Sequence, residues 1–149
     1  MKKYEILEHI SDLKIKALGK DKKEAFKNAL LGMFGGARYK PISKIKNFTP
    51  TPNFGVEASK SKREIKISSS DLQSLLVDFL SEALYLSEIN QEVYYDVQFK
   101  KFSDKNIEGI LSGKKLKRIG VQIKGVTYHG LDIHQKKDKT WEAILLFDI

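Results

Sequence analysis

No cysteine occurs among the 149 residues, which excludes disulfide bonds, thiol nucleophiles and thiolate metal ligands. No apolar run approaches the roughly 20 residues that a membrane-spanning helix needs. The lysines near Met1 are not followed by the apolar segment of a signal peptide. We therefore expect a cytoplasmic protein with no membrane association.

Arginine is also scarce, because 24 of the 27 basic residues are lysine and only Arg38, Arg63 and Arg118 are arginine. Arginine is the usual bidentate partner of phosphates and bases. The net charge of +8 therefore does not decide between a nucleic-acid surface and solvated lysines.

Several functional motifs are missing as well. The glycines form neither a dinucleotide-binding fingerprint nor a P-loop, and the sequence has no nucleophile elbow and no helical zinc motif. A length of 149 residues with 41% hydrophobic and 31% charged residues is typical of one soluble domain, which we expect to span residues 1–149.

Two amphipathic helices are expected. The first begins at a capping pattern of Asp21 and Glu24 and ends at Gly35-Gly36. The second begins at a similar pattern of Ser70 and Gln73. Its apolar residues recur at helical spacing, which is typical of a core-facing stripe: Leu72, Leu75, Leu76, Phe79, Leu80, Ala83 and Leu84.

The remaining segments alternate as strands do, with turns at Asp104-Lys105, Ser112-Gly113 and residues 136–139. The fold class that this order predicts is α+β, with two amphipathic helices packed on a largely antiparallel or mixed β-sheet. The expected strands are Tyr4–Glu8, Leu13–Leu18, Ile42–Phe48, Gly55–Ala58, Arg63–Ser69, Val93–Phe102, Asn106–Leu111, Lys117–Ile123, Val121–Tyr128, Leu131–Gln135 and Thr140–Phe147.

The last strand, Thr140–Phe147, carries apolar residues on both faces, which is typical of a strand inside a sheet. Asp148 and Ile149 follow it directly, so a side-chain carboxylate and the terminal carboxylate stand together where the core ends. Two anions at such a place are costly unless a cation neutralises them. This end of the chain is therefore the first candidate for a functional site.

Polar residues at other strand ends are candidates to join that pair. They are His9, Ser11 and Asp12 at the break after the first strand, and Lys124, Thr127 and His129 around a segment bracketed by glycines. Oxygen ligands of this kind suit calcium or magnesium.

Plainer interpretations stay open on the residues alone. Asp12 is also suited to a turn in which it bonds its own backbone, and Lys124 to a solvent-facing position. His129 and His134 are also suited to the role of partly buried histidines with a satisfied hydrogen bond. Asp148 fits a frayed terminus equally well.

The pattern of these residues resembles the archease family. His9, Asp12, Gly19 and Glu24-Ala25-Phe26 match the family's opening, which has a His-Thr-Ala-Asp motif, although Ile10-Ser11 and Lys14 differ from the usual residues. Further matches are Leu75, Leu76, Phe79, Leu80 and Glu82 in the second helix, the segment Lys124-Gly-Val-Thr-Tyr-His129, and the ending Phe147-Asp148-Ile149.

The resemblance implies an accessory protein, not an enzyme, that assists an RtcB-type RNA-splicing ligase in tRNA splicing. Members promote guanylylation of the ligase's histidine and multiple turnover, so RNA is engaged indirectly through the ligase. The resemblance also implies a divalent cation, calcium in the family, with Asp12, Asp148 and Ile149 as its ligands. His9, Lys124, Thr127 and His129 would border the site.

Two other functions remain as alternatives. One is a direct RNA-binding module, which the net charge and the strand aromatics Tyr94, Tyr95 and Phe99 favour. The other is a small metal-dependent hydrolase that uses Asp12, Asp148 and His129. Lys136 and Lys137, close in sequence to the chain end, are candidates for a basic contact with the ligase.

Overall fold

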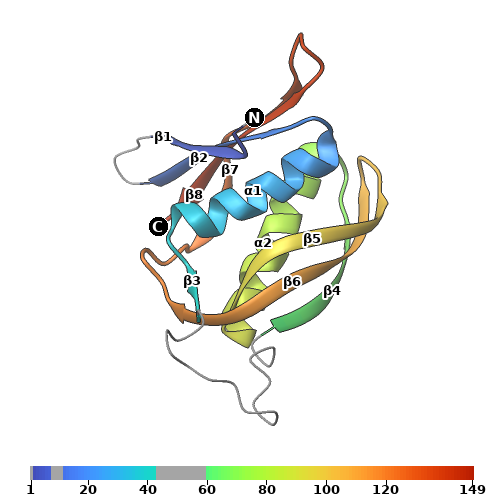
Figure 1. The fold of residues 1–149 in the computed structure, drawn as a ribbon. Helices are drawn as coiled ribbons and strands as arrows, with labels where there is room; N and C mark the ends of the chain where they lie inside the picture. The colour runs from blue at the N-terminus through green and yellow to red at the C-terminus, as the bar shows by residue number, and fades with distance from the viewer. Residues whose placement is uncertain (1, 8–11, 43–59) are drawn as a thin grey trace.

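Figure 1 shows the computed structural model of the chain, which describes residues 2–7, 12–42 and 60–149. Its helices are α1 (Lys22–Gly36) and α2 (Leu72–Asn90). Its strands are β1 (Tyr4–Leu7), β2 (Asp12–Gly19), β3 (Lys40–Pro41), β4 (Lys60–Ser68), β5 (Glu92–Phe102), β6 (Asn106–Arg118), β7 (Gly125–Gln135) and β8 (Trp141–Asp148).

The strands form two sheets rather than the one that the sequence predicts. The first has the order β1-β2-β8-β7, and in the second β6 pairs with β3, β4 and β5. All of these pairings are antiparallel. Helix α1 packs against β2 and β5, and α2 packs against β7, β5 and β4, so the helices lie between the sheets (Figure 1). The α+β class is confirmed.

Both helices begin at an aspartate. Asp21 accepts a hydrogen bond from the N–H of Glu24 at 2.8 Å, as expected for the first helix. The predicted start of the second helix was wrong by one residue, because Asp71 rather than Ser70 caps α2. The Asp71 carboxylate accepts a hydrogen bond from the N–H of Ser74 at 2.7 Å. Hydrogen bonding from Ser74 lowers the pKa of Asp71, since it favours the charged carboxylate. A charged acceptor at the positive end of a helix is stabilised more than a hydroxyl is.

The predicted stripe of α2 is core. Leu75, Leu76, Phe79, Leu80 and Ala83 are fully buried, Leu84 is nearly so and Leu72 is partly buried. The Phe79 ring centroid lies 5.7 Å from that of Phe26 of α1, so aromatic packing joins the two helices.

Two strand boundaries differ from the prediction. Ser112 and Gly113 lie inside the continuous strand β6, where Gly113 leaves room for the ring of Tyr94. Gly113 therefore allows close packing against Tyr94 and does not form the predicted turn. The predicted strand at Lys117–Ile123 is wrong, because β6 ends at Arg118 and Ile123 enters the core as a buried loop residue.

The two runs predicted before the last strand are one strand, β7, which begins at Gly125 rather than Val121 and has a register shift between Thr127 and Asp132. Most of the predicted strand Ile42–Phe48 and all of Gly55–Ala58 lie outside the described residues. Within the described ranges, no helix is long and apolar enough to cross a membrane.

Candidate functional site

Asp12 and Asp148 lie directly opposite each other on neighbouring strands. Asp12 is the first residue of β2, and the β2–β8 register pairs it with Asp148, the last residue of β8. On the other side of β8, Gly125 of β7 pairs with Asp148. Residues that pair in this way have Cβ atoms about 4.5–5.5 Å apart and side chains on the same face of the sheet. The fold thus joins two carboxylates from opposite ends of the sequence.

The buried residues of β2 and β8 fix this register. Ile15 and Ala17 pair with Leu145 and Ala143, and all four are fully buried on the face that meets the helices. Alternation along the strands then places Asp12 and Asp148 on the opposite face of the sheet. A slip of one residue would move the apolar set out of the core, so packing specifies the pairing of the two acids.

The pairing bears on two of the open interpretations. Asp12 begins strand β2, and Asp148 is held between strands on both sides rather than frayed. The N–H of Lys124 also donates to the Asp148 carbonyl oxygen at 2.7 Å. Ile149 follows β8 and is 38% exposed.

Among the residues expected to border the site, Lys124 adjoins Asp148 through its backbone, and Thr127 pairs with Leu146, two residues before Asp148. Lys124 and His129 are exposed, and the Thr127 hydroxyl accepts a hydrogen bond from the His129 N–H at 2.8 Å. Within the described ranges, no side chain of Lys124, Thr127 or His129 forms a hydrogen bond or ion pair with Asp148. His9 lies outside these ranges.

The candidate metal ligands, which are the carboxylates of Asp12, Asp148 and Ile149, are all oxygen donors. No group of three or more His, Cys, Asp or Glu side chains that could hold a metal occurs in the part of the chain that the structure describes. Two opposed carboxylates are nevertheless suitable ligands for a hard divalent cation, which accepts carbonyl oxygens and water at its other positions. The residues present therefore fit calcium or magnesium better than a metal that prefers nitrogen or sulfur.

A second polar cluster, in the other sheet, was missed by the sequence reasoning. Glu92 of β5 is only 5% exposed, and it accepts two hydrogen bonds of 3.0 Å from Arg63 and one of 2.9 Å from the Tyr94 hydroxyl. Burial alone would raise the pKa of Glu92, but hydrogen bonds from Arg63 and Tyr94 outweigh it and hold that pKa below its usual value. Burial and the hydrogen bond to Glu92 raise the pKa of Tyr94 to about 12.

This cluster gave little signal in the sequence. Arg63 and Glu92 are 29 residues apart, and only the common pairing of β4 and β5 with β6 brings them together. The scarcity of arginine was the one available hint, because a bidentate guanidinium–carboxylate pair is a usual role for a single arginine near a core. Its hydrogen bonds are satisfied internally, so we assign the cluster to stability.

The fold and site define an α+β protein whose two helices lie between antiparallel sheets and whose acidic residues meet at a strand end. The sequence profile of the archease protein family matches residues 4–149, and the chain belongs to this family.

Known relatives agree with this assignment. The chain is 34% identical to the protein archease of Methanosarcina mazei, with 99% of this chain and 97% of that protein covered. It is 33% identical to the protein archease of Methanosarcina acetivorans over the same shares.

Two solved structures share the fold. The solution structure of protein 1598 from Methanobacterium thermoautotrophicum has a TM-score of 0.62 at 23% identity and covers 100% of both chains. The crystal structure of an archease from Thermotoga maritima, described as a possible chaperone, has a TM-score of 0.63 at 15% identity and covers 96% of this chain and 94% of that one.

Proposed function

We propose that this chain is an accessory protein of an RtcB-type RNA-splicing ligase, and that it acts through a divalent-cation site at Asp12, Asp148 and Ile149. Family membership supports the general role, and the ligase as partner follows from the resemblance described above. The observation that carries the site is the direct opposition of Asp12 and Asp148 in the β2–β8 register.

The residues perform a simple task in this proposal. Asp12 and Asp148 supply two carboxylates on one face of a rigid sheet, and Ile149 supplies its carboxylate beside them. The N–H of Lys124 holds the backbone of Asp148 in place through its carbonyl oxygen. When bound, calcium or magnesium would supply positive charge that attracts phosphate or ligase carboxylates.

The direct test mixes the protein with an RtcB-type ligase and GTP and follows guanylylation of the ligase histidine. The native chain should accelerate guanylylation and allow multiple turnover. Asp12→Asn and Asp148→Asn should each remove most of the acceleration while the protein stays folded. Glu64→Gln is the matched control, because Glu64 is an exposed carboxylate in the other sheet. Equal acceleration by all four proteins would contradict the proposed site.

The hydrolase alternative gains no support from the described geometry. It requires His129 beside the two aspartates, but this histidine is exposed and its side chain makes no hydrogen bond with Asp148 in the described ranges. Incubation of the protein alone with a cyclic-phosphate RNA end, without ligase, distinguishes the two functions. Turnover that is lost in Asp12→Asn would favour the hydrolase.

A further inference from the structure

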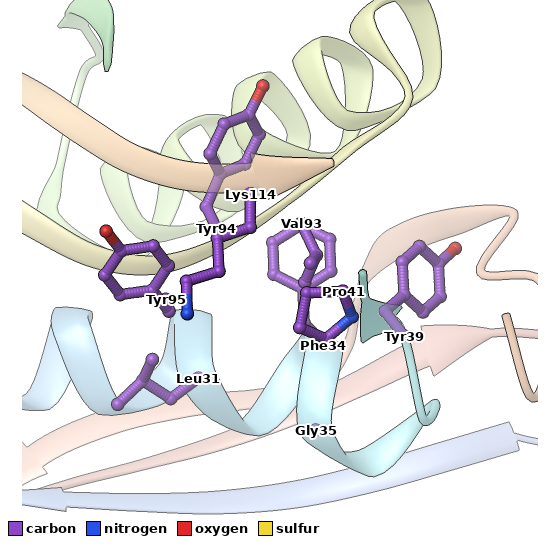
Figure 2. A pocket seen from close by; sticks show the side chains of 9 residues that line it. All are labelled: Leu31, Phe34, Gly35, Tyr39, Pro41, Val93, Tyr94, Tyr95 and Lys114. Atoms are coloured by element: carbon purple, nitrogen blue, oxygen red, sulfur yellow. The ribbon is translucent and has the colours of Figure 1, made fainter. Parts of the chain in front are cut away.

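An aromatic pocket lies between α1 and the second sheet, and neither of the two aspartates lines it. Nine residues line it, and its volume is about 200 Å³. Figure 2 shows Leu31, Phe34 and Gly35 of α1 on one side and Tyr95 and Lys114 on the other, with Pro41 in the middle of the view and Tyr39 at one end. The remaining lining residues are Val93 and Tyr94 of β5.

Tyr95 differs from the other aromatic residues named above as candidates for RNA stacking. Tyr94 is 1% exposed and its hydroxyl is committed to Glu92, and Phe99 packs against the core. Tyr95 is 42% exposed. It is also the residue skipped by the β5–β6 register, which passes from Tyr94 to Asp96. Irregularities of this kind re-aim a side chain and are frequent beside binding sites.

The pocket carries positive charge and no negative charge of its own. Lys114 is the single charged residue among the nine that line it, and its Nζ lies 5.4 Å from the centroid of the Tyr95 ring. Lys60 of β4 lies directly opposite Lys114 in the β4–β6 strand pairing. The nearby carboxylates of Glu92 and Asp96 are paired with Arg63 and Lys27.

An occupant that fits this arrangement combines a flat ring with an adjacent anion. A carboxylate side chain could form an ion pair with Lys114 but would leave the aromatic part of the pocket empty. A nucleotide unit fills both parts, because its base has a π-face for Tyr95 and its phosphate carries the charge that Lys114 attracts. The net charge of +8 adds long-range attraction for a polyanion.

We propose that this pocket binds single-stranded nucleic acid, with one base against Tyr95 and the adjoining phosphate at Lys114. The inference is independent of the ligase-related function, because it involves neither the aspartate pair nor a metal.

The experiment measures fluorescence anisotropy of a labelled oligouridylate of about ten nucleotides with the full chain, in chelator and without ligase. Tyr95→Ala should weaken binding by about 5- to 150-fold, whereas Tyr95→Trp should retain it. Lys114→Ala should weaken binding and reduce the slope of log affinity against log salt by about 0.7, the loss of one phosphate contact.

Two matched controls separate the pocket from general surface effects. Tyr85→Ala removes a tyrosine from α2 that is even more exposed than Tyr95, and Lys105→Ala removes an exposed lysine from the turn before β6. Both should change the affinity by less than about twofold. Circular dichroism of each variant verifies the fold.

Three outcomes would overturn the proposal. They are absence of saturable binding by the native chain, equal affinity of Tyr95→Ala and Tyr85→Ala, and Tyr95-dependent binding of a labelled glutamate–tyrosine peptide in place of the oligonucleotide. Because the assay contains no ligase, its failure would leave the guanylylation test unaffected, and failure of guanylylation would leave this result standing.

Discussion

Asp12 and Asp148 stand in one cross-strand pair, although 136 residues separate them in the sequence. Like charges directly opposite each other destabilise an antiparallel pair by a few tenths to about 1 kcal/mol. The strands nevertheless hold the pair in register through the buried residues on their other face. Binding of a cation to this pair is expected to stabilise the folded chain.

The first prediction concerns this charge pair. In chelator, Asp148→Asn should leave the free energy of unfolding unchanged or raise it by up to about 1 kcal/mol, because one of two like charges is removed. Added calcium should raise the Tm of the native chain and leave the Tm of the variant nearly unchanged. Thermal unfolding at fixed protein concentration measures both. A calcium-dependent rise of equal size in the variant would show that Asp148 is no ligand.

The second prediction concerns the core face of α2. Leu76 and Leu80 are fully buried, so Leu76→Ala and Leu80→Ala should each cost about 2–5 kcal/mol through lost burial and the cavity left behind. Tyr85→Ala on the exposed face of the same helix should cost less than about 0.5 kcal/mol. Urea titration measures all three. A loss below about 1 kcal/mol at both leucines would mean that the helix does not pack as described.

The third prediction concerns pH and the Glu92 cluster. The pKa of Glu92 lies below its usual value of 4.5, so its contribution to stability is present above that value and is lost as pH falls through the lower folded pKa. Glu92→Gln should cost about 1–3 kcal/mol at pH 7, and this difference should shrink as the solution is acidified. Denaturant unfolding of both proteins between about pH 7 and 3 measures the difference. A constant difference across that range would contradict the assignment.

Tyr94 gives the corresponding alkaline prediction. Its folded pKa of about 12 lies above the usual 10.0, so the neutral phenol is favoured in the folded state. Its contribution should be complete below about pH 10 and should be lost as pH rises towards 12. Tyr94→Phe, which cannot ionise, should show a flatter stability profile in this range.

The fourth prediction concerns Lys136 and Lys137 and the aspartate pair. They are close to the last strand in sequence, but they precede β8, whereas Asp148 ends it. Eight residues of strand put the two ends roughly 24 Å apart, which is beyond the Debye length of about 8 Å at physiological salt. The β7–β8 hairpin accordingly projects away from the C-terminal end in Figure 1.

The double variant Lys136→Glu/Lys137→Glu should therefore bind calcium within about twofold of the native affinity. Isothermal titration calorimetry in physiological salt measures it. A much higher affinity in the double variant would mean that the hairpin approaches the aspartate pair in solution.

The sequence predicted the helices and the buried last strand because their apolar residues recur with the periods of 3.6 and 2 that packing demands. It failed at Ser112-Gly113 because a glycine that accommodates a tyrosine ring and a glycine in a turn look alike without the partner strand. The Arg63–Glu92 pair was hidden for a related reason, since sheet pairing between distant segments sets it. At the candidate site, the residues indicated two acids, but only the register showed that they are direct neighbours.

The most direct test of the metal-site proposal extends the chain by one glycine after Ile149. This change converts the Ile149 carboxylate into an amide carbonyl and moves the negative charge away, while β2 and β8 keep their register. An N-terminal glycine before Met1 is the matched control. We predict that the C-terminal extension weakens calcium binding and ligase guanylylation strongly and that the N-terminal extension affects neither. Native calcium affinity and native stimulation by the C-terminally extended protein would contradict the proposed role of the Ile149 carboxylate.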